Sequence, residues 1–261
     1  MLAKDLERTG MRRCRLCWVQ EDENSALELE EQSRNNPDDA YLHYRLAAKY
    51  IVLCRYDRAH EAVTRAIDLG MNDDVGYGML GRVCVESGRM EEAKEASVKA
   101  FKINSNNPMS SVNLAIYYSL KGDFETAMDY FDIAARLAPE SHRLFGERGL
   151  HYARVGMIHE ALADLKKAIE LHPCNQDYYL NMSEIYLKNG QRDEARKVLE
   201  MSIDNRPGCA ESYHSLAKIY ADCGMGDAAL ENIDKALQLD PSNSDFISCR
   251  NHILRAADPF S

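Results

Sequence analysis

Cys14 and Cys17 are the first residues whose types and spacing suggest chemistry, because they form a C-x-x-C motif. Such a pair can supply half of a structural zinc site or the two thiols of a redox site. A structural zinc site needs four ligands, and no second pair follows at a suitable spacing. A thioredoxin-like redox site needs a βαβ unit, which the surrounding sequence does not predict. We therefore expect no metal site and assign the pair no role.

The segment GYGMLG at 76–81 satisfies the G-x-G-x-x-G pattern of dinucleotide-binding loops. That loop follows a β-strand and opens a helix, whereas the residues before this segment read MNDDV. None of the eight histidines forms an H-E-x-x-H motif, and no G-x-S-x-G, P-loop or EF-hand pattern occurs. We therefore expect a protein that is not an enzyme and that carries no cofactor.

The composition narrows the classes of partner. Charged residues make up 28% of the 261 residues, and the formal net charge is −10, which disfavours nucleic acid and anionic membranes as partners. No segment approaches the roughly 18 apolar residues of a membrane span, and the N-terminal residues lack the apolar core of a signal peptide. The eight cysteines follow no recurring spacing, which is typical of reduced thiols. We expect a cytoplasmic protein without membrane insertion.

A repeated pattern predicts the elements that would position any site. Five further amphipathic segments resemble RYDRAHEAVTRAIDLG at 55–70, and large and small apolar residues recur on one helical face upstream of each of the six. A glycine between the two segments ends the first helix, but Cys54 replaces it in the first copy, which predicts a strained turn. Each copy should form an antiparallel helix pair that packs on its neighbours. One alanine marks each copy, 34 residues after the last: Ala59, Ala93, Ala127, Ala161, Ala195 and Ala229.

At this period the residue types recur in one order: an aromatic residue, Leu, Gly or Ala, Tyr, Gly, Ala, Ala and Pro. In this order the chain resembles the tetratricopeptide repeat. The resemblance implies an all-α fold, a right-handed α-solenoid of stacked antiparallel helix pairs. Two departures concern local packing: Arg148 stands where leucine is usual, and Gly70-Met71 replaces the usual proline. The resemblance covers six consecutive units: 40–73, 74–107, 108–141, 142–175, 176–209 and 210–243.

The ends of this array, which spans 36–243, are expected to differ from its units. Residues 244–261 continue the apolar spacing and should form a capping helix and a tail, because the end of an array otherwise exposes its stacking face. Residues 1–35 are predicted to be an irregular N-terminal segment. They form either a degenerate half-repeat that caps the array or an arm that makes a homo-oligomer by docking on a second molecule.

In the tetratricopeptide family, the first helices of successive pairs line a concave groove that receives a peptide or a helix of a partner. Its early positions here are apolar and rich in methionine, which suits an apolar segment. Co-chaperones of the family also grip a terminal carboxylate, but Gly78 and Glu147 stand where that clamp has cations. By resemblance, the partner-binding residues are Tyr41, Tyr44, Val52, Met79, Arg82, Met109, Val112, Asn113, Ile116, Arg143, Asn181 and Lys188.

The resemblance favours a non-catalytic scaffold or adaptor that binds a peptide or helix segment of a partner protein. One alternative is a self-assembling structural protein of a bacterial organelle or of a secretion or pilus system. Another is a positioning subunit of an enzyme complex.

Overall fold

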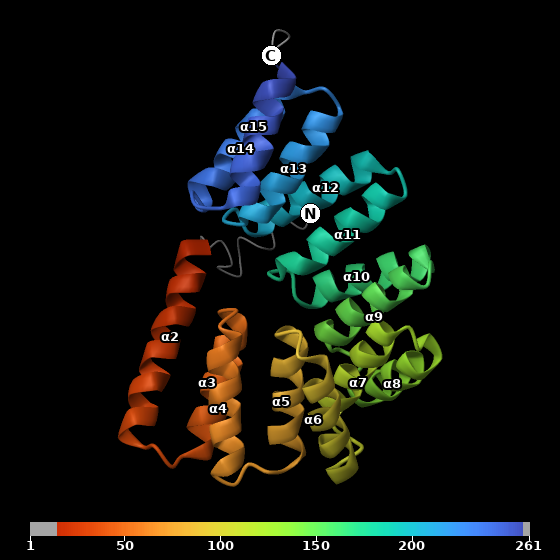
Figure 1. The fold of residues 1–261 in the computed structure, drawn as a ribbon. Coiled ribbons are helices and arrows are strands. Elements are labelled where there is room, and N and C mark those ends of the chain that lie inside the picture. The colour runs from red at the N-terminus through yellow and green to blue at the C-terminus, as the bar shows by residue number, and fades with distance from the viewer. Residues whose placement is uncertain (1–14, 258–261) are drawn as a thin grey trace. The chain divides into compact units, whose positions relative to one another are not determined.

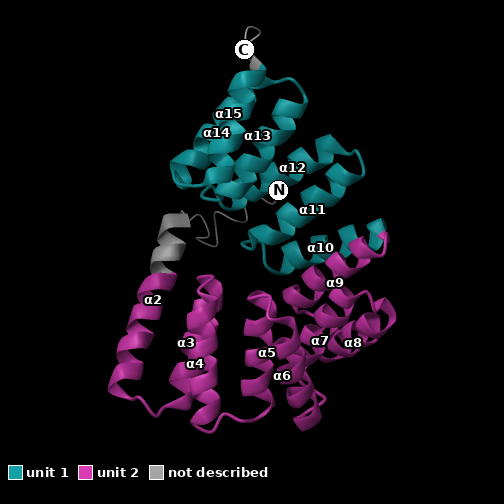
Figure 2. Ribbon diagram, in the orientation of Figure 1, with its two compact units in different colours: residues 1–17, 158–261 teal, residues 18–157 magenta. Residues whose placement is uncertain are grey.

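Residues 15–257 are described by a computed structural model, and they form helices joined by short turns, without a strand (Figure 1). They divide into two compact units, one of residues 18–157 and one that contains the residues from 158 onward (Figure 2). Over the described residues, no helix combines the length and the apolar character that a bilayer span requires.

The unit of residues 18–157 contains three antiparallel helix pairs between two single helices. The single helices are α2 (Arg15–Asn35) at the start and α9 (His142–Arg154) at the end, where α9 packs on α7 and α8. Successive pairs are in contact because the second helix of one pair packs on the first helix of the next pair. The pairs are α3 (Ala40–Val52) with α4 (Tyr56–Asp68), α5 (Asp74–Glu86) with α6 (Met90–Ile103), and α7 (Pro108–Lys121) with α8 (Phe124–Leu137).

The other unit begins with α10 (Ile158–Leu171) and ends with α15 (Ser244–Ala257), which packs on α13 and α14. The boundary between the units therefore falls inside the predicted repeat 142–175. The all-α fold of tandem helix pairs is confirmed. The pairs here are α11 (Gln176–Lys188) with α12 (Arg192–Asn205), and α13 (Ala210–Asp222) with α14 (Gly226–Leu239).

Capping residues with the same period of 34 explain where the first helices begin. In five of them, the side chain before the helix accepts a hydrogen bond from a backbone N–H of the first turn, which is otherwise unpaired. Most first helices end before a glycine of positive φ, such as Gly122 at 81°. Cys54 adopts a φ of 55° at the corresponding place, so the predicted strain there is confirmed. The five capping residues are Asp39, Asp73, Asn107, Ser141 and Asn175.

The repeated small residues form the seams inside the pairs. All six alanines that mark the copies are buried, and so are the small residues predicted for the first helices, such as Ala47 and Ala115. Arg148, the departure from leucine, places its guanidinium 5.4 Å from the ring of Phe145 and 5.7 Å from that of Tyr152. Its cation–π contacts replace the expected apolar packing.

The helix α2 packs on the first pair within the unit of residues 18–157. Leu29 is buried in the same apolar cluster as Leu46, and Tyr50 donates a 2.7 Å hydrogen bond to Glu30. Within the described residues, this helix therefore packs on the first pair through Leu29 and Glu30. Cys14 and the side chain of Cys17 lie outside the described part of the chain.

The helix α15 buries only two of the four apolar side chains that were expected to pack on the last pair. Phe246 and Ile253 are buried in a cluster with Ile233 of α14, whereas Ile247 and Leu254 are 44% and 39% exposed. The helix therefore covers the last pair with one face and presents apolar side chains on another.

Candidate functional site

The predicted groove residues differ widely in exposure. Tyr41 and Val52 are 61% and 58% exposed, and Lys188 is also exposed. Tyr44, Arg82, Met109, Arg143 and Asn181 are half-buried. The other four are buried: Met79, Val112, Asn113 and Ile116.

The four buried residues belong to the packing between helices, and one of them, Val112, also lines the pocket described below. Met79 lies in the cluster around Val63, whereas Val112 and Ile116 lie in the cluster around Phe131. The sequence could not separate them from groove residues, because the groove and the seam between first helices occupy adjacent stripes on each helix.

Asn113 is also committed to internal contacts. Its Nδ2 atom donates a 3.1 Å hydrogen bond to the carbonyl oxygen of Gly78, and its Oδ1 atom accepts one of 2.9 Å from Arg143. Because both the nitrogen and the oxygen of this buried amide are hydrogen-bonded, Asn113 links neighbouring first helices. We therefore do not count Asn113 among the residues that bind a partner protein.

Five of the six remaining groove residues of this unit, all except Val52, form what we call the tyrosine–arginine surface: Tyr41, Tyr44, Arg82, Met109 and Arg143. The rings of Tyr41 and Tyr44 are stacked with centroids 6.2 Å apart. Burial raises the pKa of Tyr44, and the positive charge of Arg82 offsets part of the shift. The Nε atoms of Arg82 and Arg143 lie 3.9 Å and 3.8 Å from Oε1 of Glu86. These contacts connect side chains of α3, α5 and α9.

A pocket of about 220 Å³ lies at the end of this surface. Arg82 and Arg143 supply its positive charge, and Met109, Val112 and Leu144 supply apolar walls. Such a pocket can hold one side chain of a partner, with its polar end near the guanidinium groups.

Asn181 and Lys188 lie on α11, in the other unit. Lys188 is paired at 2.7 Å with Glu184, one turn away on the same helix. An exposed pair of this kind contributes at most a few tenths of a kcal/mol, and it gives Lys188 a local role on the helix surface.

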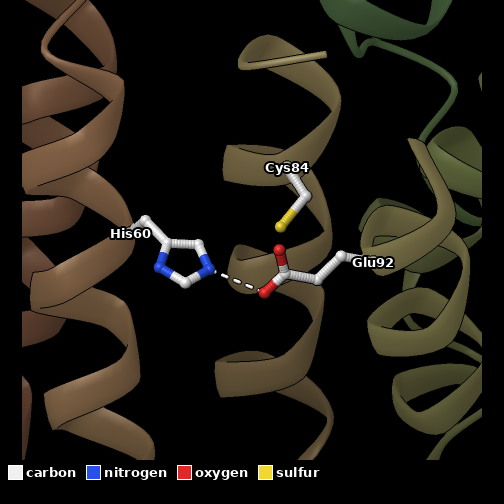
Figure 3. A group of neighbouring side chains, drawn as sticks. All are labelled: His60, Cys84 and Glu92. Atoms are coloured by element: carbon white, nitrogen blue, oxygen red, sulfur yellow. Dashed lines mark hydrogen bonds and ion pairs between the residues drawn. The ribbon is translucent and has the colours of Figure 1, made fainter. Parts of the chain in front are cut away.

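A second constellation joins His60 of α4, Cys84 of α5 and Glu92 of α6 (Figure 3). The donor atoms of the three side chains all lie within 4.8 Å of one another. The Nε2 atom of His60 is 2.6 Å from Oε1 of Glu92. Cys84 is fully buried, whereas the side chains of His60 and Glu92 are 24% and 42% exposed.

The cluster has a distinct electrostatic character. Burial raises the pKa of the Cys84 thiol to about 12, and the neighbouring carboxylate of Glu92 contributes. The hydrogen bond from His60 lowers the pKa of Glu92. The thiol is therefore protonated at neutral pH, and it lies near the carboxylate of Glu92.

Sequence reasoning missed this cluster, since its three members come from three helices and follow no motif spacing. The one sequence signal is Cys84 itself. It stands where five other copies of the repeat carry a tyrosine: Tyr50, Tyr118, Tyr152, Tyr186 and Tyr220.

Comparisons with known proteins agree with the helix-pair architecture. Three profiles, each described as Tetratricopeptide repeat, match the chain at 153–219, at 114–180, and at both 76–107 and 210–243. A TPR repeat-containing protein of Methanocaldococcus jannaschii is 32% identical over 109 residues, which are 42% of this chain and 18% of that protein. Hsp70-Hsp90 organizing protein 2 of Arabidopsis thaliana is 42% identical over 52 residues, which are 20% of this chain and 9% of that protein. The matches span less than a fifth of either relative.

A solved structure shares the fold at low identity. PilW, described as a widely conserved type IV pilus biogenesis factor, has a TM-score of 0.63 and 17% identity, with 80% of this chain and 97% of that chain covered. At this identity the likeness concerns the fold alone.

Proposed function

This chain belongs to the tetratricopeptide repeat family, and we propose that it is a non-catalytic scaffold that binds a peptide or helix segment of a partner protein. Repeat arrays of this kind use rows of side chains on successive helices as extended binding surfaces. The single observation that supports the proposal is the tyrosine–arginine surface with its pocket, in which side chains of α3, α5, α7 and α9 are contiguous.

The surface combines features typical of recognition of a protein segment. Tyr41 is a large aromatic side chain that remains mostly exposed, and Met109 adapts its shape to apolar partners. Arg82 and Arg143 favour an acidic or polar side chain in the pocket. We therefore expect the bound segment to place apolar residues on Tyr41 and a carboxylate or amide near the two arginines.

Screening a displayed library of random peptides with the full chain tests this proposal. The affinity of an enriched peptide is then measured by fluorescence anisotropy for the wild type and for the double variant Tyr41→Ala, Met109→Ala. We expect about tenfold weaker binding, as for the loss of two contact side chains at the centre of an interface. The variant Ile247→Ser on α15 is the control, because it removes an exposed apolar side chain elsewhere. Failure to enrich any peptide, or equal affinity of wild type and double variant, would overturn the assignment.

Self-assembly is a second candidate, favoured by the exposed Ile247 and Leu254 on the terminal helix α15. Light scattering coupled to size-exclusion chromatography distinguishes the two functions. A monomeric full chain rules out self-assembly, whereas an oligomer that dissociates on deletion of residues 1–35 assigns the contact to the N-terminal segment. An oligomer that dissociates instead in the variant Ile247→Ser, Leu254→Ser assigns the contact to α15.

A further inference from the structure

The cluster of His60, Cys84 and Glu92 has no part in the proposed binding of a protein segment. Figure 3 shows the three side chains pointing toward one another from three consecutive helices. His60 belongs to the first helix pair, and Cys84 and Glu92 belong to the second. A ligand held by all three would therefore bridge two neighbouring repeats.

The three donor types suit a zinc-class ion. Imidazole nitrogen, thiolate sulfur and carboxylate oxygen are the ligands of Zn²⁺ in proteins, and sites with three protein ligands keep a fourth position open for water. With bond lengths of about 2.0–2.3 Å, donor atoms of a tetrahedral site stand roughly 3.3–3.8 Å apart. The atoms here lie within 4.8 Å of one another, so each needs to move by about 1 Å at most.

The side chains of His60 and Glu92 have room to make the movement that ion binding requires. The contact of 2.6 Å between His60 and Glu92 is a hydrogen bond and must lengthen to admit an ion. Both side chains are partly exposed, so they can rotate apart, and an ion can reach the buried thiol from their side. Cys84 is held in place by its burial and supplies the fixed donor.

We propose that His60, Cys84 and Glu92 bind one divalent ion of the zinc class, which links the first two helix pairs and keeps one water in its fourth position. On binding, the proton of the Cys84 thiol passes to solvent, and His60 binds the ion through a deprotonated Nε2 atom, with the ring proton on Nδ1. The resulting thiolate and carboxylate balance the charge of the ion.

The sequence makes this site a local feature of one junction between repeats. At the positions that correspond to His60 and Glu92 in the next unit stand Lys94 and Thr126, and Tyr118 replaces Cys84. This set offers no comparable ligands, so we expect no second site of this kind at the next junction.

Titration of the full chain with Co²⁺ tests the proposal, since cobalt reports both stoichiometry and ligand type. The parent protein carries Cys14→Ser and Cys17→Ser, which removes the C-x-x-C pair as a competing site. We expect one equivalent of Co²⁺ to bind, with a thiolate-to-cobalt charge-transfer band and visible bands of tetrahedral intensity. Zn²⁺ should then displace the cobalt and abolish the spectrum.

Variants identify the ligands. His60→Gln and Glu92→Gln should each weaken metal binding at least tenfold, and Cys84→Ser should remove the charge-transfer band. His159→Gln and Cys223→Ser, two exposed side chains elsewhere, are the matched controls and should leave the spectrum unchanged.

Zinc should also raise the melting temperature of the parent but not that of His60→Gln. If the parent shows no band, or if the band persists in both His60→Gln and Cys84→Ser, the proposal is wrong. Because His60 and Glu92 are partly exposed, their variants decide the matter even if Cys84→Ser does not fold.

Discussion

Arg143 donates a 2.9 Å hydrogen bond from Nη2 to Oδ1 of Asn113, which lies 30 residues earlier in the chain. The Nδ2 atom of the same asparagine donates to the carbonyl oxygen of Gly78 at 3.1 Å. One buried amide thus joins α9, α7 and α5, the first helices of three successive repeats. The contact beneath the tyrosine–arginine surface is therefore part of the stack itself.

Replacing Asn113 by alanine should destabilise the protein by about 1–3 kcal/mol. The change removes two buried hydrogen bonds, the one to the carbonyl oxygen of Gly78 and the one from Arg143, and leaves the mostly buried guanidinium of Arg143 without this acceptor. Urea unfolding followed by circular dichroism measures the effect. Asn181→Ala, at the corresponding but half-buried position of α11, is the matched control and should cost less. Equal losses in both variants would contradict a special role for Asn113.

Gly81→Ala should destabilise the second repeat by roughly 1–3 kcal/mol through overpacking. A Cβ atom at this position would meet Oγ of Ser97 and lie 2.9 Å from Nδ2 of Asn113. Within the described residues, Oγ of Ser97 has no hydrogen-bond partner, so Ser97→Ala alone should cost little. The double variant Gly81→Ala, Ser97→Ala should recover part of the lost stability, because Ser97→Ala removes the Oγ atom with which the new Cβ atom would clash. Strictly additive free energies of unfolding would argue against this contact.

Cys54→Gly should stabilise the protein by about 1 kcal/mol. Cys54 is the one residue other than glycine with a positive φ, 55°, within the described chain, and a left-handed conformation costs a side-chain-bearing residue roughly 1–2 kcal/mol. The reverse change, Gly88→Ala, serves as the control. It places a Cβ atom in open space on a backbone with φ of 75°, and should destabilise by a similar amount. Thermal unfolding of both variants checks the two signs.

Stability should fall as the pH decreases from neutral through the ordinary pKa range of histidine. His151 is buried with its Nδ1 atom 3.0 Å from Oγ of Ser119, and burial, together with the charge of Arg154, lowers the pKa of His151. Below about pH 6.5 the unfolded chain therefore binds a proton that the folded chain does not bind, which favours unfolding. The loss continues until the pH passes the lowered pKa of the folded state.

The variant His151→Gln should reduce this pH dependence. Melting temperatures at about pH 7.5 and about pH 5.5, on either side of the ordinary pKa, should differ less in the variant than in the wild type. His159→Gln, which changes an exposed histidine, should leave the difference as it is. Some dependence should remain in His151→Gln, because burial also lowers the pKa of His214.

Residue patterns along the chain were enough to predict the repeat architecture. The alanines at a period of 34 residues, the small residues of the first helices and the strain at Cys54 all depend on local helix geometry and neighbour packing. Such features repeat in the sequence because each helix pair packs on its neighbour in the same way. The exposure of the groove residues was predicted less well, since Met79 and Asn113 lie only a fraction of a turn from the exposed stripe.

The sequence by itself determined the helix pairs and their small-residue seams, because these follow from periodicities within about 34 residues. Only the tertiary structure decided which side chains from different helices meet. Asn113 reaches Gly78 and Arg143, and His60 reaches Glu92, because stacking brings residues about 30 positions apart within hydrogen-bond distance. A period specifies that neighbouring repeats pack, but side-chain length and burial at each junction determine which polar groups they bring together.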